Sequence, residues 1–165
     1  MKTISVLLTK YSDCISTFIY YISGREYTHA SIALEEPGEN AYYSFNYKGF
    51  CEETIKKHRK KGVCKSVRYR FEVSDKTYEK IKRRLHFFKM HRSTFAYSRL
   101  GVLLCLLHIP FCRKNHYFCS QFVAELLEDA EEIRLKKPSS LYLPNDLRQE
   151  LADSPCLMSI NYNVV

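Results

Sequence analysis

The sequence predicts an α+β domain in which helices pack on a small antiparallel sheet. Its 165 residues suit one domain, residues 1–165, and a content of 45% hydrophobic and 27% charged residues is typical of a globular chain. Read along the chain, the periodicity of apolar residues gives a helix, a group of strands and then several helices. This order is typical of an α+β protein.

The N-terminal half is predicted to form the sheet. Thr3–Leu8 is an apolar run that predicts a buried strand, and Ser12–Ser23 has the spacing of a helix. His29–Leu34 and the segment from Tyr42 onward flank a Pro-Gly pair, so they predict a hairpin. Val63–Val73 alternates between apolar and polar residues, which predicts a further strand.

The C-terminal half is predicted to be mainly helical. Ser74 is placed to cap a long helix, and Leu100–Leu107 predicts a second, apolar one. Because spanning a bilayer takes about 20 residues, we expect this second helix to be buried in the core and not to cross a membrane. A third helix begins at Cys119, a short one begins at Pro144, and the final segment CLMSINYNVV returns as a strand.

Charge and cysteine content indicate which partners and compartment to expect. The net charge of +8 favours anionic partners or surfaces without identifying one. The basic run Lys56–Lys61 lacks interleaved aromatic residues, so we interpret it as a solvated loop and expect no nucleic-acid binding. Seven cysteines without a CxxC pair, and an N-terminus without a long apolar region, predict free thiols in a reducing, cytoplasmic compartment.

The stretch HYFCSQFVAELLED contains the first candidate for chemistry. Phe122, Val123, Leu126 and Leu127 repeat at helical spacing, which places Cys119 where the helix begins. Ser, Thr, Asp or Asn would cap this helix better. A thiol there feels the helix dipole and the unpaired N–H groups, which lower its pKa and can later hold an oxyanion. The cysteine is therefore either a nucleophile or a small buried hydrophobic residue.

A nucleophilic cysteine needs a base, and six histidines are available. His29 differs from the others because it begins an otherwise apolar strand of the predicted hairpin. It is either a core histidine whose ring nitrogens are hydrogen-bonded or a base that reaches the N-terminus of the helix beginning at Cys119. If the Pro-Gly pair is the turn, residues whose numbers sum to about 75 face each other. Asn46 then lies opposite His29, and Ser44 opposite Ser31, so both polar residues are candidates for orienting the imidazole.

A metal site is the competing interpretation of the same region. His108, Cys112, His116 and Cys119 are all residue types that zinc accepts, and they lie within one short segment. Their spacing fits no standard zinc pattern, so we expect the grouping to be a coincidence and predict neither a metal nor a cofactor.

The block YTHASIAL followed later by YFCSQFVAELL resembles the NlpC-type papain-like cysteine peptidases. The order, histidine first and cysteine second, is similar to their circularly permuted branch, which includes bacterial permuted amidases and the lecithin:retinol acyltransferase-like proteins. The segments LLTKYSDCISTFIYYISGREYTHASIAL and PSSLYLPNDL extend the similarity over most of the chain. The segment YYSFNYKGF resembles the strand that follows the histidine in members from Firmicutes.

This resemblance implies a papain-like fold, with a small barrel-like antiparallel sheet that carries His29 against the helix beginning at Cys119. It implies Cys119 as the nucleophile and His29 as the base, with Ser44 or Asn46 as the third residue. Neither of these is the second histidine of the acyltransferase-like proteins, which argues against a retinoid or phospholipid acyltransferase.

The resemblance also implies the surroundings of the reaction. Tyr11 and Ser12, by analogy, and Tyr117 and Gln121, which flank the nucleophile, are expected to shape the substrate pocket. We therefore expect a cysteine hydrolase that acts by acyl transfer on an amide: a peptide, a cell-wall-derived fragment or an acylated amine. The alternatives are a lipid acyltransferase or lipase with the same dyad, an inert ligand-binding relative, and a zinc-binding module.

Overall fold

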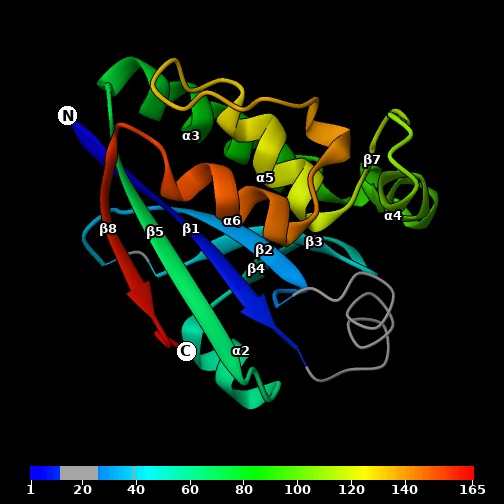
Figure 1. Cartoon of the computed structure of the whole chain (residues 1–165), viewed down its shortest axis with the longest axis horizontal. Coiled ribbons are helices and arrows are strands. Elements are labelled where there is room, and N and C mark those ends of the chain that lie inside the picture. The colour runs from blue at the N-terminus through cyan, green and yellow to red at the C-terminus, as the bar shows by residue number, and fades with distance from the viewer. Residues whose placement is uncertain (12–25, 39) are drawn as a thin grey trace.

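The computed structural model describes residues 1–11, 26–38 and 40–165. Across these residues, the centre of the fold is a six-stranded sheet with the order β4-β3-β2-β1-β5-β8 (Figure 1). Every neighbouring pair in it is antiparallel. The strands are β1 (Lys2–Lys10), β2 (His29–Leu34), β3 (Tyr42–Asn46), β4 (Gly49–Glu53), β5 (Lys65–Val73) and β8 (Leu157–Tyr162).

Helices cover the two faces of the sheet unequally. The larger helices lie together on one face in Figure 1, and they are α3 (Asp75–Met90), α5 (Cys119–Leu127) and α6 (Pro144–Ala152). The opposite face carries α2 (Ile55–Lys60), whose Ile55 packs against Leu7 and Ala33. The remaining short elements are η1 (Arg92–Thr94), β6 (Ala96–Tyr97), α4 (Arg99–Leu106), β7 (His116–Tyr117) and η2 (Ser139–Leu141).

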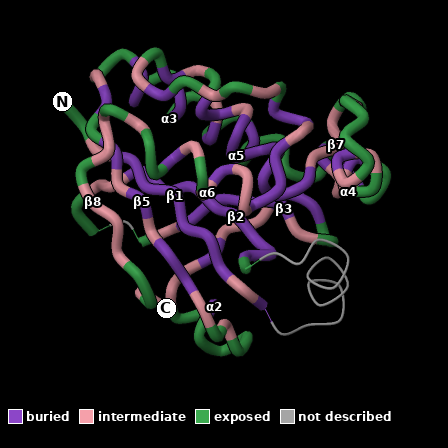
Figure 2. Tube along the Cα trace, in the orientation of Figure 1, coloured by how far each residue is buried: buried purple, intermediate pink, exposed green. Residues whose placement is uncertain are grey.

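The main core lies between the sheet and the three larger helices. Along β1, Ile4, Val6 and Leu8 belong to this core, whereas Leu7 belongs to the smaller cluster beneath α2. Successive side chains of a strand point to opposite faces, so a nearly continuous apolar run is what a strand covered on both sides requires. Figure 2 shows the buried residues concentrated in the central strands and in α5.

The predicted α+β class is confirmed, and so are several of its elements. Ser74 caps α3 by accepting a hydrogen bond from the N–H of Thr77, and the inner face of that helix is buried as expected. The hairpin between β2 and β3 pairs Ile32 with Tyr43, the register that the sum of about 75 predicts. The strand predicted at the C-terminus is β8.

Two fold predictions need correction or fall outside the described residues. The sheet is open and not a closed barrel, because β4 and β8 are edge strands with one neighbour each among the described residues. The predicted helix Ser12–Ser23 lies outside the described residues.

The helix predicted at Leu100–Leu107 forms as α4, but the prediction that it is buried is wrong. Only Gly101 and Cys105 are buried in it, while Leu103 is 54% exposed. The helix lies at one end of the molecule, where Phe118 and Leu143 pack against a single side of it. None of the helices in the described part of the chain is both long and apolar enough to cross a membrane.

The basic run Lys56–Lys61, predicted to be a solvated loop, is mostly the helix α2. Thr54 caps this helix by accepting a hydrogen bond from the N–H of Lys57. The cationic side chains Lys56 and Lys57 are exposed, but His58 turns inward and is fully buried. The basic composition of the run therefore did not indicate that His58 faces inward, and His58 lies beside the candidate site.

Candidate active site

Cys119 is the first residue of α5, and the residue before it, Phe118, provides no side-chain cap. The thiol is 7% exposed and has hydrogen bonds with the backbone N–H groups of Ala30 and Ser120 and with the ring of His29. Burial alone would raise the pKa of this thiol, but the hydrogen bond and charge of His29, together with the two N–H groups, lower it below its usual value. These contacts therefore favour the thiolate form of Cys119.

His29 is the first residue of β2, and its backbone pairs with Thr9 of β1. Its Nε2 lies 2.7 Å from Oε2 of Glu53, which leaves Nδ1 for the hydrogen bond with the Cys119 thiol. Burial disfavours the charged ring, but the carboxylate of Glu53 and the hydrogen bonds to Cys119 and Glu53 raise the pKa of His29 to about 10. The ring is therefore an imidazolium at neutral pH.

Glu53 is the partner of His29 that the sequence did not reveal. It is the last residue of β4, is 3% exposed, and pairs with Tyr42 of β3. Burial would raise the pKa of its carboxyl group, but the charge and hydrogen bond of His29, with smaller contributions from His58 and Lys61, lower it to about 2. The site therefore has a buried carboxylate, an imidazole ring and a thiol in series.

Neither of the two predicted partners, Ser44 and Asn46, hydrogen-bonds His29. The Ser44 hydroxyl donates to the carbonyl of Ala30 at 2.6 Å, and Oδ1 of Asn46 accepts from the N–H of Lys48 at 2.9 Å. The strand register was correct, but Ser44 fixes the backbone of β2 and Asn46 fixes the turn between β3 and β4. The orienting residue comes from one strand further along the sheet.

A second buried histidine lies behind the carboxylate. Nε2 of His58 faces Oε2 of Glu53 at 3.6 Å, and its Nδ1 lies 2.5 Å from the hydroxyl of Tyr11. Burial lowers the pKa of His58 to about 4, with Glu53 opposing the shift, so this ring is neutral. A neutral ring accepts the Tyr11 hydroxyl at Nδ1 and directs its Nε2–H towards Glu53.

Tyr11, which the resemblance implies as a substrate-pocket residue, contacts both histidines of the site. Its ring meets the ring of His29 edge-on, with centroids 5.3 Å apart. The hydroxyl bonds His58, so it orients the second histidine and the carboxylate behind it.

The structure shows the contacts of two of the other residues predicted to line the substrate pocket, and the third is not described. The ring of Tyr117 packs on Phe45, with centroids 5.2 Å apart, and its hydroxyl donates to Glu125. Gln121 is buried in the first turn of α5, where its amide donates to Cys112 Sγ and its Oε1 lacks a hydrogen-bond partner among the described residues. Ser12 lies outside the described residues.

Cys51 provides a contrast to Cys119 in the same surroundings. It pairs with Ser44 across β3 and β4, two residues before Glu53. Burial and the charge of Glu53 raise the pKa of its thiol. Proximity to the carboxylate therefore does not activate a cysteine, and activation at Cys119 depends on His29 and on the backbone N–H groups.

Three of the four residues in the competing zinc interpretation have the following surroundings. His108 and Cys112 are exposed, and Nδ1 of His116 bonds the carbonyl of Lys114. Within the described ranges, no three His, Cys, Asp or Glu side chains are grouped so as to hold a metal ion.

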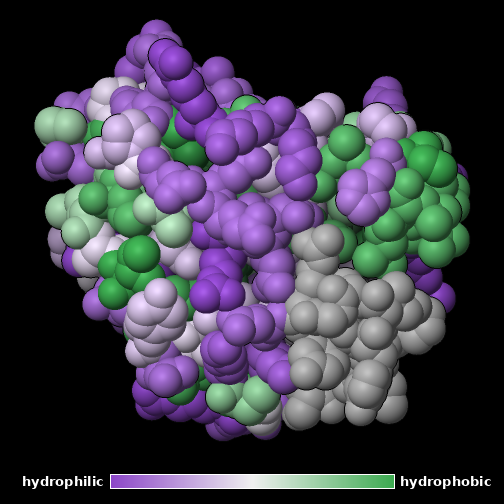
Figure 3. All heavy atoms as spheres, in the orientation of Figure 1, coloured by the Kyte–Doolittle hydropathy of each residue, from purple (hydrophilic) through white to green (hydrophobic). Residues whose placement is uncertain are grey.

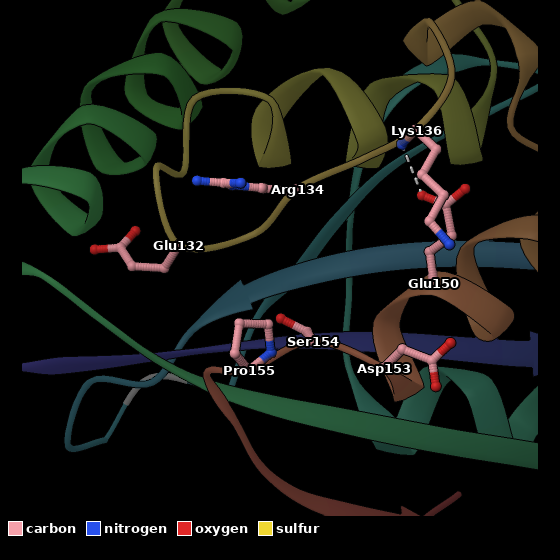
Figure 4. Close-up of a pocket in the computed structure, with 7 residues that line it drawn as sticks. All are labelled: Glu132, Arg134, Lys136, Glu150, Asp153, Ser154 and Pro155. Atoms are coloured by element: carbon pink, nitrogen blue, oxygen red, sulfur yellow. Dashed lines mark hydrogen bonds between the residues drawn. The ribbon is translucent and has the colours of Figure 1, made fainter.

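A hollow of about 240 Å³ lies away from these residues, between the segment that follows α5 and the end of α6 (Figure 4). It is lined by Glu132, Arg134, Lys136, Glu150, Asp153, Ser154 and Pro155. Two of its carboxylates are engaged: Glu150 accepts from the N–H of Lys136, and Glu132 accepts from the N–H of Ser74 just before α3. We assign no chemistry to this hollow.

In comparisons with known proteins, no family model matches the chain and no curated protein is significantly similar to it. The resemblance to the permuted papain-like enzymes therefore stays a prediction. The functional argument rests on the geometry of Cys119, His29 and Glu53.

Proposed function

We propose that this protein is a papain-like cysteine hydrolase of the permuted NlpC type, which cleaves an amide by acyl transfer through Cys119, His29 and Glu53. The observation that carries the proposal is the continuous series of thiol, imidazole and carboxylate, with the thiol at the first turn of a helix. A nucleophile, a base in contact with it and a group that orients the base are the three parts that covalent catalysis requires.

The reaction begins from the ion pair of thiolate and imidazolium. Sγ of Cys119 attacks the amide carbonyl and forms an S–C bond, while free N–H groups at the start of α5, including that of Cys119, stabilise the oxyanion. The C–N bond then breaks, and the proton on His29 passes to the leaving amine. Water gives a proton to His29 and attacks the thioester, which releases the acid and restores the ion pair.

Glu53 favours an amide as the substrate. An amine leaves an acyl carbon only when it receives a proton, and Glu53 keeps that proton on His29. The amide would be a peptide, a cell-wall-derived fragment or an acylated amine. We place the activity in the cytoplasm, because the six cysteines of the described residues are free thiols.

A second candidate is transfer of an acyl group from a lipid ester or thioester by the same three residues. The observation that favours it is the exposed apolar side of α4, because the inner side of that helix packs on Phe118, the residue before the nucleophile. Product analysis of an acyl-lipid and a peptide amide offered to the same preparation separates the two candidates.

The pH dependence of Cys119 alkylation tests the proposal directly. Iodoacetamide labelling of each cysteine, followed by mass spectrometry of peptides, reports the thiolate fraction at each pH. In the wild type, we expect Cys119 to react well below the free-thiol pKa of about 8.5. In His29→Ala, which removes the positive charge, we expect this midpoint to rise by about one pH unit or more.

Asn46→Ala is the matched control, since Asn46 bonds the turn and not His29. It should leave the Cys119 profile unchanged, while the exposed Cys64 and Cys112 act as internal references for access of the reagent. A Cys119 profile that is ordinary in the wild type and insensitive to His29→Ala would refute the hydrolase. The protein would then be better explained as a fold that only binds a ligand.

A further inference from the structure

The helix α4 has an apolar surface that no described element covers. Leu100, Leu103 and Leu107 follow each other at helical spacing and are 50%, 54% and 60% exposed, and Ile109 beside them is 47% exposed. We call these four residues the α4 surface. Figure 3 shows apolar residues gathered at the right-hand end of the molecule, where Figure 1 places α4. Contiguous apolar patches on proteins mark sites of interaction.

The charge of the surrounding sequence is one-sided. Residues 80–124 contain nine Lys and Arg residues and no Asp or Glu. The nine are Lys80, Lys82, Arg83, Arg84, Lys89, Arg92, Arg99, Arg113 and Lys114. The α4 surface therefore lies within a long part of the sequence that has cationic side chains and no carboxylate.

The cations closest to α4 in the sequence are also not neutralised by the protein. Lys80, Lys89 and Arg84 form ion pairs with carboxylates of other segments. In contrast, Arg99 at the start of α4, and Arg113 and Lys114 in the loop after it, are exposed and have no ion pair among the described residues. Three free cations thus flank the exposed leucines.

We propose that the α4 surface docks onto an anionic lipid bilayer. The leucines would enter the interface while Arg99, Arg113 and Lys114 meet the lipid headgroups, the combination by which an amphipathic surface binds a membrane. A second copy of the chain fits this surface less well, because symmetric pairing would bring the same cations of both copies together. The proposal does not depend on the acyl-transfer chemistry.

Docking would have a consequence for the active site. Phe118 packs on the inner side of α4 together with Cys105, and Cys119 follows Phe118 directly. Docking through α4 therefore brings the end of α5 that carries the nucleophile towards the lipid surface.

Co-sedimentation of the full chain with vesicles tests the proposal. Vesicles of phosphatidylcholine alone are compared with vesicles that also contain phosphatidylglycerol, each at low and high salt. We expect binding to the anionic vesicles that weakens with salt, because salt screens exposed charges. The double variant Leu103→Glu/Leu107→Glu should lower partitioning about tenfold or more. Arg113→Gln/Lys114→Gln should lower it by roughly fivefold per charge.

Met158→Glu is the matched control. Met158 is 51% exposed on β8, at the opposite end of the molecule from α4 in Figure 1, so this variant should bind as the wild type does. Cys119→Ser should also bind unchanged, which separates failure of docking from failure of the hydrolase. Circular dichroism and thermal melting verify that each variant folds.

Three results would overturn the proposal. The first is recovery of the wild type in the supernatant with both kinds of vesicle, and the second is sedimentation of the leucine variant to the same extent as the wild type. The third is a wild-type dimer in analytical ultracentrifugation that the leucine variant converts to a monomer, with no vesicle binding. In that case the α4 surface would be an interface between two copies.

Discussion

Glu53 determines the electrostatics of the candidate site because three basic groups share its carboxylate. His29 approaches Oε2 at 2.7 Å, His58 approaches the same oxygen at 3.6 Å, and Nζ of Lys61 lies 3.5 Å from Oε1. An unpaired buried carboxylate would take up a proton to avoid the cost of desolvation. Here the neighbouring charges keep it ionised, so it can hold the proton on His29.

Replacing Glu53 with Gln removes this charge and keeps the shape of the side chain. The pKa of His29 should fall, because its largest favourable contribution is the carboxylate of Glu53. The pKa of Cys119 should then rise, since its charged partner is lost. In the alkylation assay at pH 6, we expect slower labelling of Cys119. On any amide substrate found by screening, we expect kcat to fall about 10²-fold or more.

The adjacent acid supplies a control for this variant. Glu52 points to Lys89 of α3, 3.4 Å away, and is not part of the site. Glu52→Gln should therefore reproduce the wild-type alkylation profile. Equal effects of the two substitutions would show that Glu53 has no specific role in orienting His29.

At the scale of elements, the position of Cys119 depends on how α4 and α5 meet. Phe118 lies between them as the N-cap residue of α5, packed on Cys105 of α4. Gly101 allows this contact, because a Cβ there would lie 2.6 Å from Oγ of Ser98 and 3.2 Å from the ring of Phe118. Ser98 cannot move freely, since its Oγ caps α4 by accepting the N–H of Gly101.

Gly101→Ala is predicted to destabilise the protein, although alanine is the better helix former by about 1 kcal/mol. The added methyl group must displace either the capping Ser98 or the ring of Phe118, and overpacking of this kind costs about 1–3 kcal/mol. Urea unfolding measures the change in the free energy of unfolding. Because Phe118 precedes the nucleophile, Cys119 alkylation at low pH should also slow.

Leu100→Ala is the comparison on the same helix. Leu100 is 50% exposed, so removing its side chain should change the free energy of unfolding little. If Gly101→Ala were as stable as the wild type, the close contact between α4 and Phe118 would not constrain the start of α5.

For the whole molecule, the pKa shifts predict that stability falls as the pH falls below 6.5. His58 has a pKa of about 4 when folded and 6.5 as its ordinary value, so it takes up a proton on unfolding as the pH falls below 6.5. Its contribution to stability is present above pH 6.5 and is lost towards pH 4. His29 is shifted the other way, to about 10, so its own contribution is present below pH 6.5 and is lost as the pH rises towards 10. The lowered pKa of Cys119 offsets this loss up to the ordinary pKa of the thiol, because the folded chain keeps the imidazole proton and gives up the thiol proton.

Glu53 does not contribute to the slope in this range. Its pKa falls from 4.5 to about 2 on folding, so its contribution is present above pH 4.5 and is lost only below it. Between pH 4.5 and 6.5, His58 is therefore the only one of these three groups whose contribution changes. Each group shifts stability by at most about 1.4 kcal/mol per pH unit.

Urea unfolding of the wild type and His58→Asn between pH 4.5 and 6.5 measures this effect. The variant lacks the group that takes up the proton, so its stability should fall less steeply as the pH falls. Parallel curves for the two proteins would mean that His58 has the same pKa in the folded and the unfolded chain.

Local patterns were sufficient for much of the fold. The helix α3 was predictable because a capping serine precedes it and its inner apolar residues recur at helical spacing. The hairpin register followed from one Pro-Gly turn. The positions of Cys119 and His29 at the ends of α5 and β2 were predictable for the same reason. The contact of Glu53 with His29 was not predictable, because Glu53 stands beside Glu52 and has the pattern of an ordinary acidic residue at the end of a strand.

The sequence by itself determined the α+β class, the hairpin register and the places of Cys119 and His29 at the starts of a helix and a strand, since each depends on periodicity or on a turn within a short segment. Only the tertiary structure decided that Glu53 and His58 complete the site and that α4 is exposed. These features depend on which strand pairs next to β3, on which way a basic helix turns, and on how much of an apolar helix its neighbours cover. Such contacts join segments distant in sequence, and no local spacing encodes them.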